Sequence, residues 1–447
     1  MTHETEFLVL GGGPAGLAAG VELGERALVV EREERPGGLV RAECFGGYWF
    51  DRVLHLLHFQ DPPLQEWVTG MPDACLAPCP PVAWIDSEAG TARYPLQLNL
   101  GALQQETCIR ALTELAAAAS GGGQAGSDAP AYDDYLLRSF GPTLCDLFYF
   151  PYNQKMWRRP LGELAASGQT WNLLRPRLED AVRGALAPNR DREAYNTTAF
   201  YPRPPAGAPV RGMEVLSRAL ARRVPRLHLR TTVTRMDLEH REVHALADGA
   251  PVIYRYTRGC LSTLPLPAAI AMSTPVPREL ADEVRALPHN GVLSLAFSIR
   301  GARPPSPGHW RYYPDPALPF TRLVFMAEFD PLSGPADGWG VLAEVPYRAD
   351  APPSVREAMD AARMGLIALG LLDGCEIVDE NVMVADPAYV VFTPGAEAVA
   401  GRARAHLATA GVTALGRYGR WEYSSIAGVM ADARAWAAGA AQGRMAA

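Results

Sequence analysis

Short apolar runs and glycine-rich turns divide the first part of the chain into strands and a helix. An apolar run at Phe7–Leu10 precedes a glycine turn, a small-residue helical segment and a second apolar run at Ala27–Val30. Such runs on either side of a helix are typical of parallel strands buried on both faces. Similar features return as a strand at Leu227–Arg235, an apolar segment at 261–266, and residues 415–419 before a C-terminal helix. We therefore expect one α/β unit assembled from separate segments.

The intervening segments follow other patterns. Residues 96–204 are mostly helical in pattern, with a low-complexity connection at 117–130, whereas 291–399 alternate as strands with one helix near Ser354–Leu371. The predicted fold class is α/β, with a discontinuous Rossmann-like domain, an inserted helical region and a mixed β-sheet domain that carries the substrate. The expected boundaries are 1–95, 205–290 and 400–447 for the Rossmann-like domain, 96–204 for the helical substrate or nucleotide region, and 291–399 for the antiparallel substrate sheet.

Charge and composition narrow the class of protein. The 447 residues carry a net charge of -7, with 48% hydrophobic residues, so nucleic acid is not an expected partner. Neither a basic leader followed by an apolar stretch nor an apolar run of about 18 residues occurs, so we expect a cytoplasmic protein without membrane contact. The seven scattered cysteines fit free thiols in a reducing compartment. Homo-oligomerisation stays open.

The first glycine turn carries a dinucleotide signature. Gly11, Gly13 and Gly16 have GxGxxG spacing between the first strand and the helix, and Glu31 follows the second strand, twenty positions after Gly11. In this arrangement the glycines allow a tight turn, a close approach to pyrophosphate and close helix packing. The acidic residue accepts hydrogen bonds from a ribose. The Gly37–Gly38 pair that follows favours FAD over NAD.

Seven segments in the same order resemble the UDP-galactopyranose mutase family, especially its eukaryotic-type enzymes, within the FAD-dependent amine oxidase and protoporphyrinogen oxidase-like flavoproteins. PYNQKMW resembles the family's PYNFKVW, and YPLQLN resembles its YPFQNN. The segments are YWFDRVLH (48–55), YPLQLN (94–99), PYNQKMW (151–157), NTTAFYP (196–202), PFTR (319–322), DPAY (386–389) and GRYGRWEY (416–423).

The resemblance implies flavin-dependent interconversion of the pyranose and furanose forms of a nucleotide-diphosphate hexose, through attack of N5 of reduced FAD at the anomeric carbon. NAD(P)H or another reductant would keep FAD reduced. The implied catalytic residues are Arg175, Arg322, His55, Tyr389 and Tyr423. The implied substrate-binding residues are Phe148, Tyr152, Asn153, Trp157, Asn196, Tyr312 and Gln97. The expected cofactor-binding residues are Gly11, Gly13, Pro14, Ala15, Gly16, Glu31, Arg32, Gly37, Gly38, Leu39, His55, Val233, Gly416 and Arg417.

Departures from the family pattern keep other functions open. Val53 and Leu54 stand where the family has two glycines, and Glu422 stands where an arginine is usual. These changes are compatible with an FAD-dependent oxidase or dehydrogenase of the amine-oxidase type, or with a flavoprotein that binds a nucleotide sugar without turnover. His55 and His58 lack a clear third ligand, so we expect no metal site. Lys155, the single lysine of the chain, receives no role from its sequence context.

Overall fold

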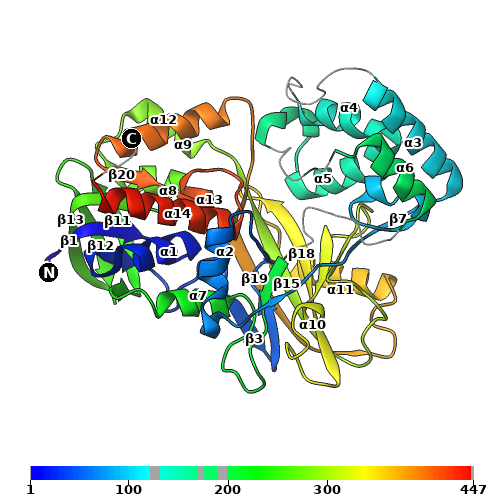
Figure 1. Ribbon diagram of the computed structural model, residues 1–447, viewed down its shortest axis with the longest axis horizontal. Helices are drawn as coiled ribbons and strands as arrows, with labels where there is room; N and C mark the ends of the chain where they lie inside the picture. Colours follow the sequence, from blue (N-terminus) through cyan, green and yellow to red (C-terminus); the bar gives the residue numbers. More distant parts are fainter. Residues whose placement is uncertain (1, 121–130, 169–172, 174, 189–198, 444–447) are drawn as a thin grey trace.

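The computed structural model describes residues 2–120, 131–168, 173, 175–188 and 199–443. Figure 1 shows an α/β lobe that contains both ends of the described chain, a second sheet at the centre, and a group of helices on the far side of that sheet. No helix in these ranges is long and apolar enough to cross a membrane. The expected α/β fold class is confirmed.

The first sheet collects strands from distant parts of the chain. Its order is β10-β2-β1-β13-β12-β11-β14, and β20 also pairs with β13. β1, β2, β10, β13 and β20 run parallel, which brings their carboxyl ends to one edge. The bounds are β1 Thr2–Leu10, β2 Ala27–Val30, β10 Leu227–His228, β11 Thr231–Asp237, β12 Glu242–Ala247, β13 Ala250–Ser262, β14 Ser273–Thr274 and β20 Val412–Ala414.

Helices cover both faces of this sheet, which explains the unbroken apolar runs in the sequence. Phe7 and Val9 of β1 share a core with α1 (Pro14–Leu23), α7 (Glu214–Ala221) and α14 (Ile426–Ala441). Leu8 and Leu10 point to the opposite core, which contains residues of α8 (Leu266–Met272), α9 (Arg278–Arg285) and α12 (Ala396–Ala408). Phe7–Leu10 of β1 are therefore buried whichever way they point, whereas Thr2 and Glu4 at the start of the strand are exposed.

The second sheet has the order β19-β15-β18-β17-β16-β7-β8. Its pairs are antiparallel except that β16 and β7 are parallel, so the sheet is mixed. The bounds are β7 Ala83–Ser87, β8 Gly90–Arg93, β15 His289–Arg300, β16 Trp310–Tyr312, β17 Arg322–Phe325, β18 Gly338–Arg348 and β19 Glu376–Val390, with α10 Met326–Phe329, α11 Val355–Ala368 and α13 Gly416–Gly419 as further helices. β7 and β8 belong to the segment 1–95, which was expected in the Rossmann-like domain. They pair instead at the edge of the second sheet, next to β16.

The helical region consists of α3 (Gln105–Ser120), α4 (Tyr132–Leu144), the π-helical turn η5 (Cys145–Tyr149), α5 (Phe150–Trp157) and α6 (Leu178–Leu186). Apolar side chains from α3, α4, η5 and α5 form one core. Most of the low-complexity connection at 117–130 lies outside the described residues. The remaining short elements are β3 Ala42–Phe45, β4 Tyr48–Asp51, β5 Leu57–His58, β6 Leu76–Pro78, β9 Ala199–Pro202 and α2 Pro62–Thr69.

One strand prediction is wrong in detail. The apolar pattern at Leu227–Arg235 predicts a single strand, but β10 ends at His228 and β11 begins at Thr231. Arg230 between them has a φ of 49°, a left-handed conformation that interrupts an extended strand. β10 consequently pairs with β2, while β11 pairs with β12 at the other side of the sheet.

Candidate functional site

The glycine turn at the end of β1 is shaped by close backbone packing. A Cβ atom on Gly16 would lie 1.9 Å from the carbonyl oxygen of Gly11, so only glycine allows α1 to approach the turn. Gly11 has a φ of 103°, and a Cβ there would meet the Thr263 hydroxyl at 2.3 Å. A Cβ on Gly13 would meet no atom within 4 Å. Gly13 therefore leaves open space at the N-terminus of α1, where a pyrophosphate could approach.

Glu31 stands at the end of β2, as the spacing predicts. Its carboxylate accepts hydrogen bonds from the Gly12 amide at 2.7 Å and from the Glu33 amide at 2.9 Å. The side chain is buried but lines the cavity described below. Each carboxylate oxygen has a second lone pair, so a ribose hydroxyl could still bind there.

A cavity of about 920 Å³ runs from this glycine turn to the second sheet and the helical region. Most of the predicted cofactor residues line it: Gly11, Gly13, Pro14, Ala15, Glu31, Arg32, Gly38, Leu39, His55, Val233, Gly416 and Arg417. Gly16 and Gly37 lie behind the surface, where Gly16 packs against Gly11 and the Gly37 amide donates to the Gly12 carbonyl at 2.8 Å. The open backbone at Gly13 and the acid at Glu31 fit an elongated dinucleotide.

His55 is a neutral group in the wall of this cavity. Burial, and next the charge of Arg417, lower the pKa of His55 to about 4. Its Nδ1 lies 2.9 Å from the Val53 carbonyl oxygen, so this nitrogen carries the proton and Nε2 is left as an acceptor. Val53 and Leu54 also line the cavity, where their side chains occupy space that glycines would leave open.

Arg417 is a buried cation held among aromatic rings. Its guanidinium carbon lies 3.9 Å from the ring centre of Tyr423 and 5.7 Å from that of Tyr389. The Nη atoms donate to the Ser424 and Ala388 carbonyls at 3.3 and 3.2 Å, whereas Nε is buried without a partner among the residues that the structure describes. Such a donor is costly to bury unless a ligand accepts from it.

Arg322 and three tyrosines gather on the second-sheet side of the cavity. Arg322 faces Tyr312 across β17 and β16, and Tyr389 stacks on Tyr423 with ring centres 6.5 Å apart. Glu344 accepts from Arg322 Nε at 2.5 Å and from Nη2 at 2.9 Å. Burial by itself lowers the pKa of Arg322, but the Glu344 carboxylate raises it well above the usual value. The ion pair orients the guanidinium and leaves Nη1 for a ligand.

The predicted nucleotide cluster also lines the cavity, but much of its polar capacity is used internally. Phe148 stacks on Tyr152 with ring centres 5.2 Å apart. Asn153 accepts from the Tyr132 hydroxyl at 3.1 Å and from Trp157 Nε1 at 3.2 Å, and it donates to the Tyr149 carbonyl at 2.7 Å. Gln97 accepts from the Tyr149 hydroxyl at 2.7 Å. These contacts hold the aromatic side chains in place as a pre-formed wall of the cavity. A ligand could contact this wall mainly through the faces of its rings.

Lys155 acquires a structural role. Its Nζ donates to the carbonyl oxygens of Tyr313 at 2.7 Å and Asp315 at 2.8 Å. Burial is the main reason why its pKa falls to about 8. The bonds tie α5, which carries Tyr152, to the segment that follows Tyr312. A compact ammonium on a flexible stem can reach two converging carbonyls in a buried site that offers less room for a planar guanidinium.

Of the predicted catalytic and substrate-binding residues that lie within the described ranges, Arg175 does not line the cavity. Arg175 is exposed. Asn196 lies outside the described residues. In contrast, Arg41, Arg52 and Tyr94 line the cavity although the sequence did not single them out. Arg41 follows the Gly37–Gly38 turn by three positions, and this proximity was the available signal.

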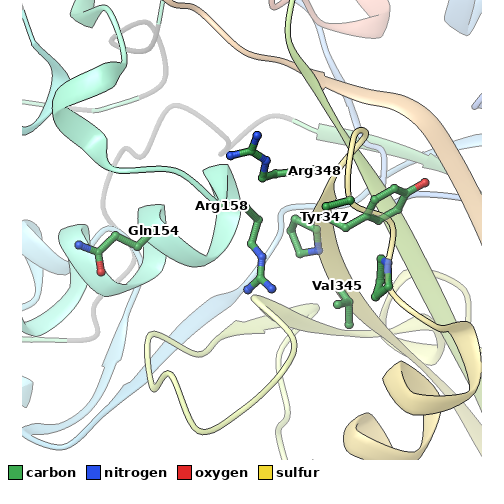
Figure 2. Close-up of a pocket in the computed structure, with 8 residues that line it drawn as sticks. Gln154, Arg158, Val345, Tyr347 and Arg348 are labelled. Carbon is green, nitrogen blue, oxygen red and sulfur yellow. The ribbon is translucent and has the colours of Figure 1, made fainter.

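A second cavity, of about 440 Å³, lies on the other side of α5 (Figure 2). Gln154 of α5 and Arg158, which directly follows α5, line it together with Val345, Tyr347 and Arg348 of β18. Arg348 is already paired with Asp350 at 2.6 Å. The two cavities have no lining residue in common, so α5 separates the glycine-turn cavity from this smaller one.

Comparison with known families identifies the class of fold. A family model described as flavin containing amine oxidoreductase matches residues 14–310, which is more than half of the chain.

Solved structures share the fold at low identity. A crystal structure of reduced UDP-galactopyranose mutase is 20% identical, with a TM-score of 0.86 over 98% of this chain and 96% of that chain. A protein from Exiguobacterium sp. 255-15, assigned as a protoporphyrinogen oxidase, is 15% identical with a TM-score of 0.70 over 98% and 99% of the two chains. Putrescine oxidase bound to putrescine is 16% identical with a TM-score of 0.62 over 98% and 99%. These similarities show the fold.

Proposed function

We propose that this chain, which belongs to the flavin-containing amine oxidoreductase family and uses FAD as its cofactor, interconverts the pyranose and furanose forms of a nucleotide-diphosphate hexose. The observation that carries the proposal is the grouping of Arg322 with Tyr312, Tyr389 and Tyr423 on one side of the cavity. The glycine turn occupies another part of the same cavity. Cofactor and sugar nucleotide would thus meet within one enclosed space.

The charged and phenolic groups suit a departing diphosphate. Arg322 remains charged because Glu344 raises its pKa, and its free Nη1 can donate to a phosphate oxygen. Burial raises the pKa of Tyr312 and Tyr389, so both phenols keep their protons and can donate hydrogen bonds at neutral pH. These donors would stabilise negative charge as the bond between the sugar and the diphosphate breaks. Arg175 is kept as a proposed second cation, although it is exposed in this structure.

The groups beside the flavin position have complementary roles. Reduced FAD, when bound, supplies the nucleophile for the anomeric carbon. The positive charge of Arg417, which lines the cavity, can stabilise an anionic ring and thereby favour its reduced form. His55 remains neutral at pH 7, so its Nε2 can accept a hydrogen bond from a hydroxyl there. The aromatic wall at Phe148 and Tyr152 would stack against the nucleotide base.

A second candidate function is oxidation of an amine by FAD. Val53 and Leu54 favour it, because their apolar side chains narrow the cavity beside His55. Arg322 and Arg417 oppose it, since two guanidinium groups repel a cationic substrate. We therefore place the mutase first.

The direct experiment uses dithionite-reduced holoprotein incubated with UDP-, GDP- and TDP-hexoses, followed by chromatography of the sugar nucleotides. Formation of a furanose isomer from one of them supports the proposal, and absence of an isomer from all of them, with FAD retained, contradicts it. Anaerobic bleaching of oxidised flavin by an amine, without dithionite, would instead support the oxidase. Sugar-nucleotide binding without either reaction would support a binding protein.

A further inference from the structure

Arg41 presents an unusual buried cation at the glycine-turn end of the cavity. Its side chain is 3% exposed, and it lines the cavity beside Gly38. Nη1 donates to the Arg35 carbonyl at 3.3 Å and lies 3.5 Å from a Glu33 carboxylate oxygen, whereas Nε is buried without a partner. Among the described residues, Arg41 and Arg417 are the two arginines with such a nitrogen, and both line this cavity.

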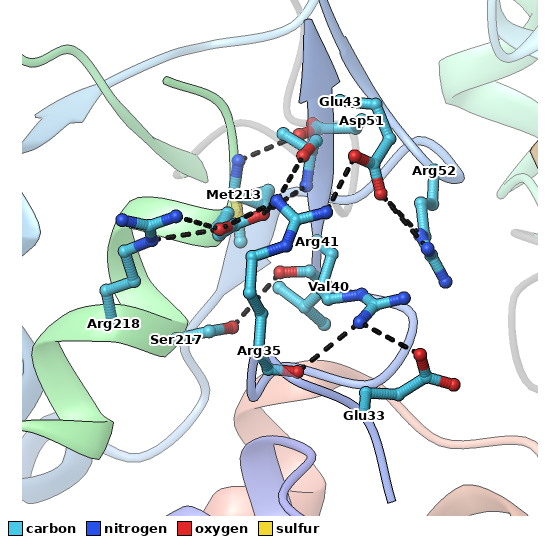
Figure 3. A network of polar contacts seen from close by, with 12 residues as sticks. Glu33, Arg35, Val40, Arg41, Glu43, Asp51, Arg52, Met213, Ser217 and Arg218 are labelled. Atoms are coloured by element: carbon cyan, nitrogen blue, oxygen red, sulfur yellow. Dashed lines mark hydrogen bonds and ion pairs between the residues drawn. The ribbon is translucent and has the colours of Figure 1, made fainter. Parts of the chain in front are cut away.

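The surrounding network leaves Arg41 short of negative charge. Figure 3 shows Arg35 and Arg52 directed at Glu43, and these ion pairs have distances of 2.7 and 3.0 Å. Arg218 binds Glu214 at 2.8 Å. Among the described residues, Glu33 contacts both Arg41 and Arg32, at 3.5 and 3.2 Å, while Glu43 and Glu214 are engaged by other arginines. Burial, and next the charge of Arg52, lower the pKa of Arg41. A guanidinium in these surroundings would be stabilised by an anion from a ligand.

The position of Arg41 indicates which anion this is. The Gly37 amide donates to the Gly12 carbonyl at 2.8 Å, and a Cβ on Gly38 would lie 3.5 Å from Gly13 Cα. The turn before Arg41 thus packs directly on the glycine loop. Arg41 Cγ would lie 3.0 Å from a Cβ on Gly37, so its stem covers this same turn. The glycine loop offers backbone amides and a helix N-terminus to a pyrophosphate but no side-chain cation.

We propose that Arg41 binds the pyrophosphate of FAD and supplies the positive charge that the glycine loop lacks. The assignment depends on the cofactor alone and is independent of the reaction that the flavin serves. It makes Arg41 a cofactor-binding residue whose guanidinium charge stabilises the bound pyrophosphate. Arg52, which also lines the cavity but already binds Glu43, contributes a more distant charge.

The test compares FAD affinity in the full-length protein across three variants. Arg41→Met keeps the length of the side chain and removes the charge, Arg41→Lys keeps a charge but lacks Nε, and Arg218→Met removes an arginine of the same network that does not line the cavity. FAD release from diluted holoprotein is followed by flavin fluorescence. We expect Arg41→Met to weaken FAD binding by about 10- to 100-fold, Arg41→Lys to recover part of the loss, and Arg218→Met to leave affinity within about twofold.

Competition with ADP and adenosine identifies the contacted group, because ADP contains a pyrophosphate and adenosine does not. We expect Arg41→Met to weaken ADP by nearly the same factor as FAD and to leave adenosine unchanged. Unchanged FAD affinity in Arg41→Met overturns the proposal. Equal losses in Arg41→Met and Arg218→Met, or equal losses for ADP and adenosine, also overturn it. If Arg41→Met does not fold, Arg41→Lys carries the same ADP-to-adenosine comparison.

Discussion

The glycine-turn end of the cavity and its second-sheet end are built in different ways. At the first, Gly11, Gly13 and Gly16 lie within six positions, and the missing side chains of Gly11 and Gly16 allow close backbone packing. At the second, Arg322, Tyr389 and Tyr423 come from three distant segments, and side chains form the surface. The first end depends on the absence of Cβ atoms, whereas the second depends on ion pairs and ring contacts between elements. Substitutions at the glycine-turn end should therefore affect folding or FAD binding, whereas substitutions at the second-sheet end should affect turnover.

The largest effect is expected where the backbone is closest. Gly16→Val places side-chain carbon 1.9 Å from the Gly11 carbonyl oxygen, so it should destabilise folding by about 3 kcal/mol or more. A Cβ at Gly13 meets no atom within 4 Å, and the φ there is -75°, so Gly13→Val should fold but lose FAD affinity by about 100-fold or more. Thermal unfolding and bound-flavin absorbance separate the two results. A Gly13→Val protein with full flavin content would contradict the assigned approach of pyrophosphate.

At the other end, a single side chain should affect turnover without affecting the cofactor. Arg322→Ala removes a buried cation from the proposed diphosphate site, and it should lower mutase turnover by about 100-fold or more while leaving the flavin spectrum unchanged. Arg311→Ala is the control, because Arg311 lies on the adjacent strand, binds Asp86 at 3.1 Å and does not line the cavity. Steady-state rates with reduced holoprotein provide the measurement. Equal rates for the two variants would remove Arg322 from the site.

Lys155→Met tests how the wall of the second-sheet end is held. Loss of two charge-assisted bonds to buried carbonyls should lower the free energy of unfolding by about 2 kcal/mol. The movement of Tyr152 and Tyr312 should also raise KM for a sugar nucleotide more than it lowers kcat. Lys155→Arg restores charge without the compact shape, so it should recover only part of the stability. Denaturant unfolding at pH 7 measures the difference, and an unchanged midpoint in Lys155→Met would show that the bonds are dispensable.

A smaller effect is expected at Asp51, which belongs to neither end. Asp51 accepts hydrogen bonds from Tyr201 at 2.7 Å and from the Met213 amide at 2.8 Å, and burial raises its pKa to about 7. Because the folded pKa exceeds the ordinary value of about 3.8, its stabilising contribution is complete below pH 4 and is lost as pH rises to about 7. Asp51→Asn should remove this part of the pH dependence. Unfolding midpoints of the two proteins between pH 4 and 8 measure it, and parallel curves would contradict the shift.

The sequence predicted the two ends unequally, for a physical reason. The glycine spacing, β2 and Glu31 are local features, and a short stretch of chain contains all the interactions that define them. The Arg322–Glu344 pair depends on the register of β17 against β18. The alternation of apolar residues predicts each strand, but it does not predict which residues of two strands lie opposite each other. Asn153 and Trp157 were predicted as nucleotide contacts, but their polar groups bond to each other. Their mutual pairing depends on one helical turn at the end of α5, a geometry that a motif match does not contain.

The position of β7 and β8 illustrates the same limit. Both strands have ordinary alternating patterns, yet they extend the second sheet through the parallel pair of β7 with β16. The pattern of a strand predicts that it will pair with a sheet, but it does not predict which sheet or which of its edge strands. The Arg230 break between β10 and β11 is also invisible to hydrophobicity, because it arises from one left-handed residue.

Lys155 gives the protein a single side-chain amine, since no other lysine occurs in the chain. That amine is enclosed between α5 and the carbonyls of Tyr313 and Asp315, so an acylating reagent can reach it only when these segments separate. An acyl group located on Lys155 itself, by mass analysis of peptides, would then record each molecule whose aromatic wall has opened. Ligands that hold the wall closed should protect the Lys155 amine from acylation. The extent of acylation at Lys155 would therefore measure how often the cavity opens.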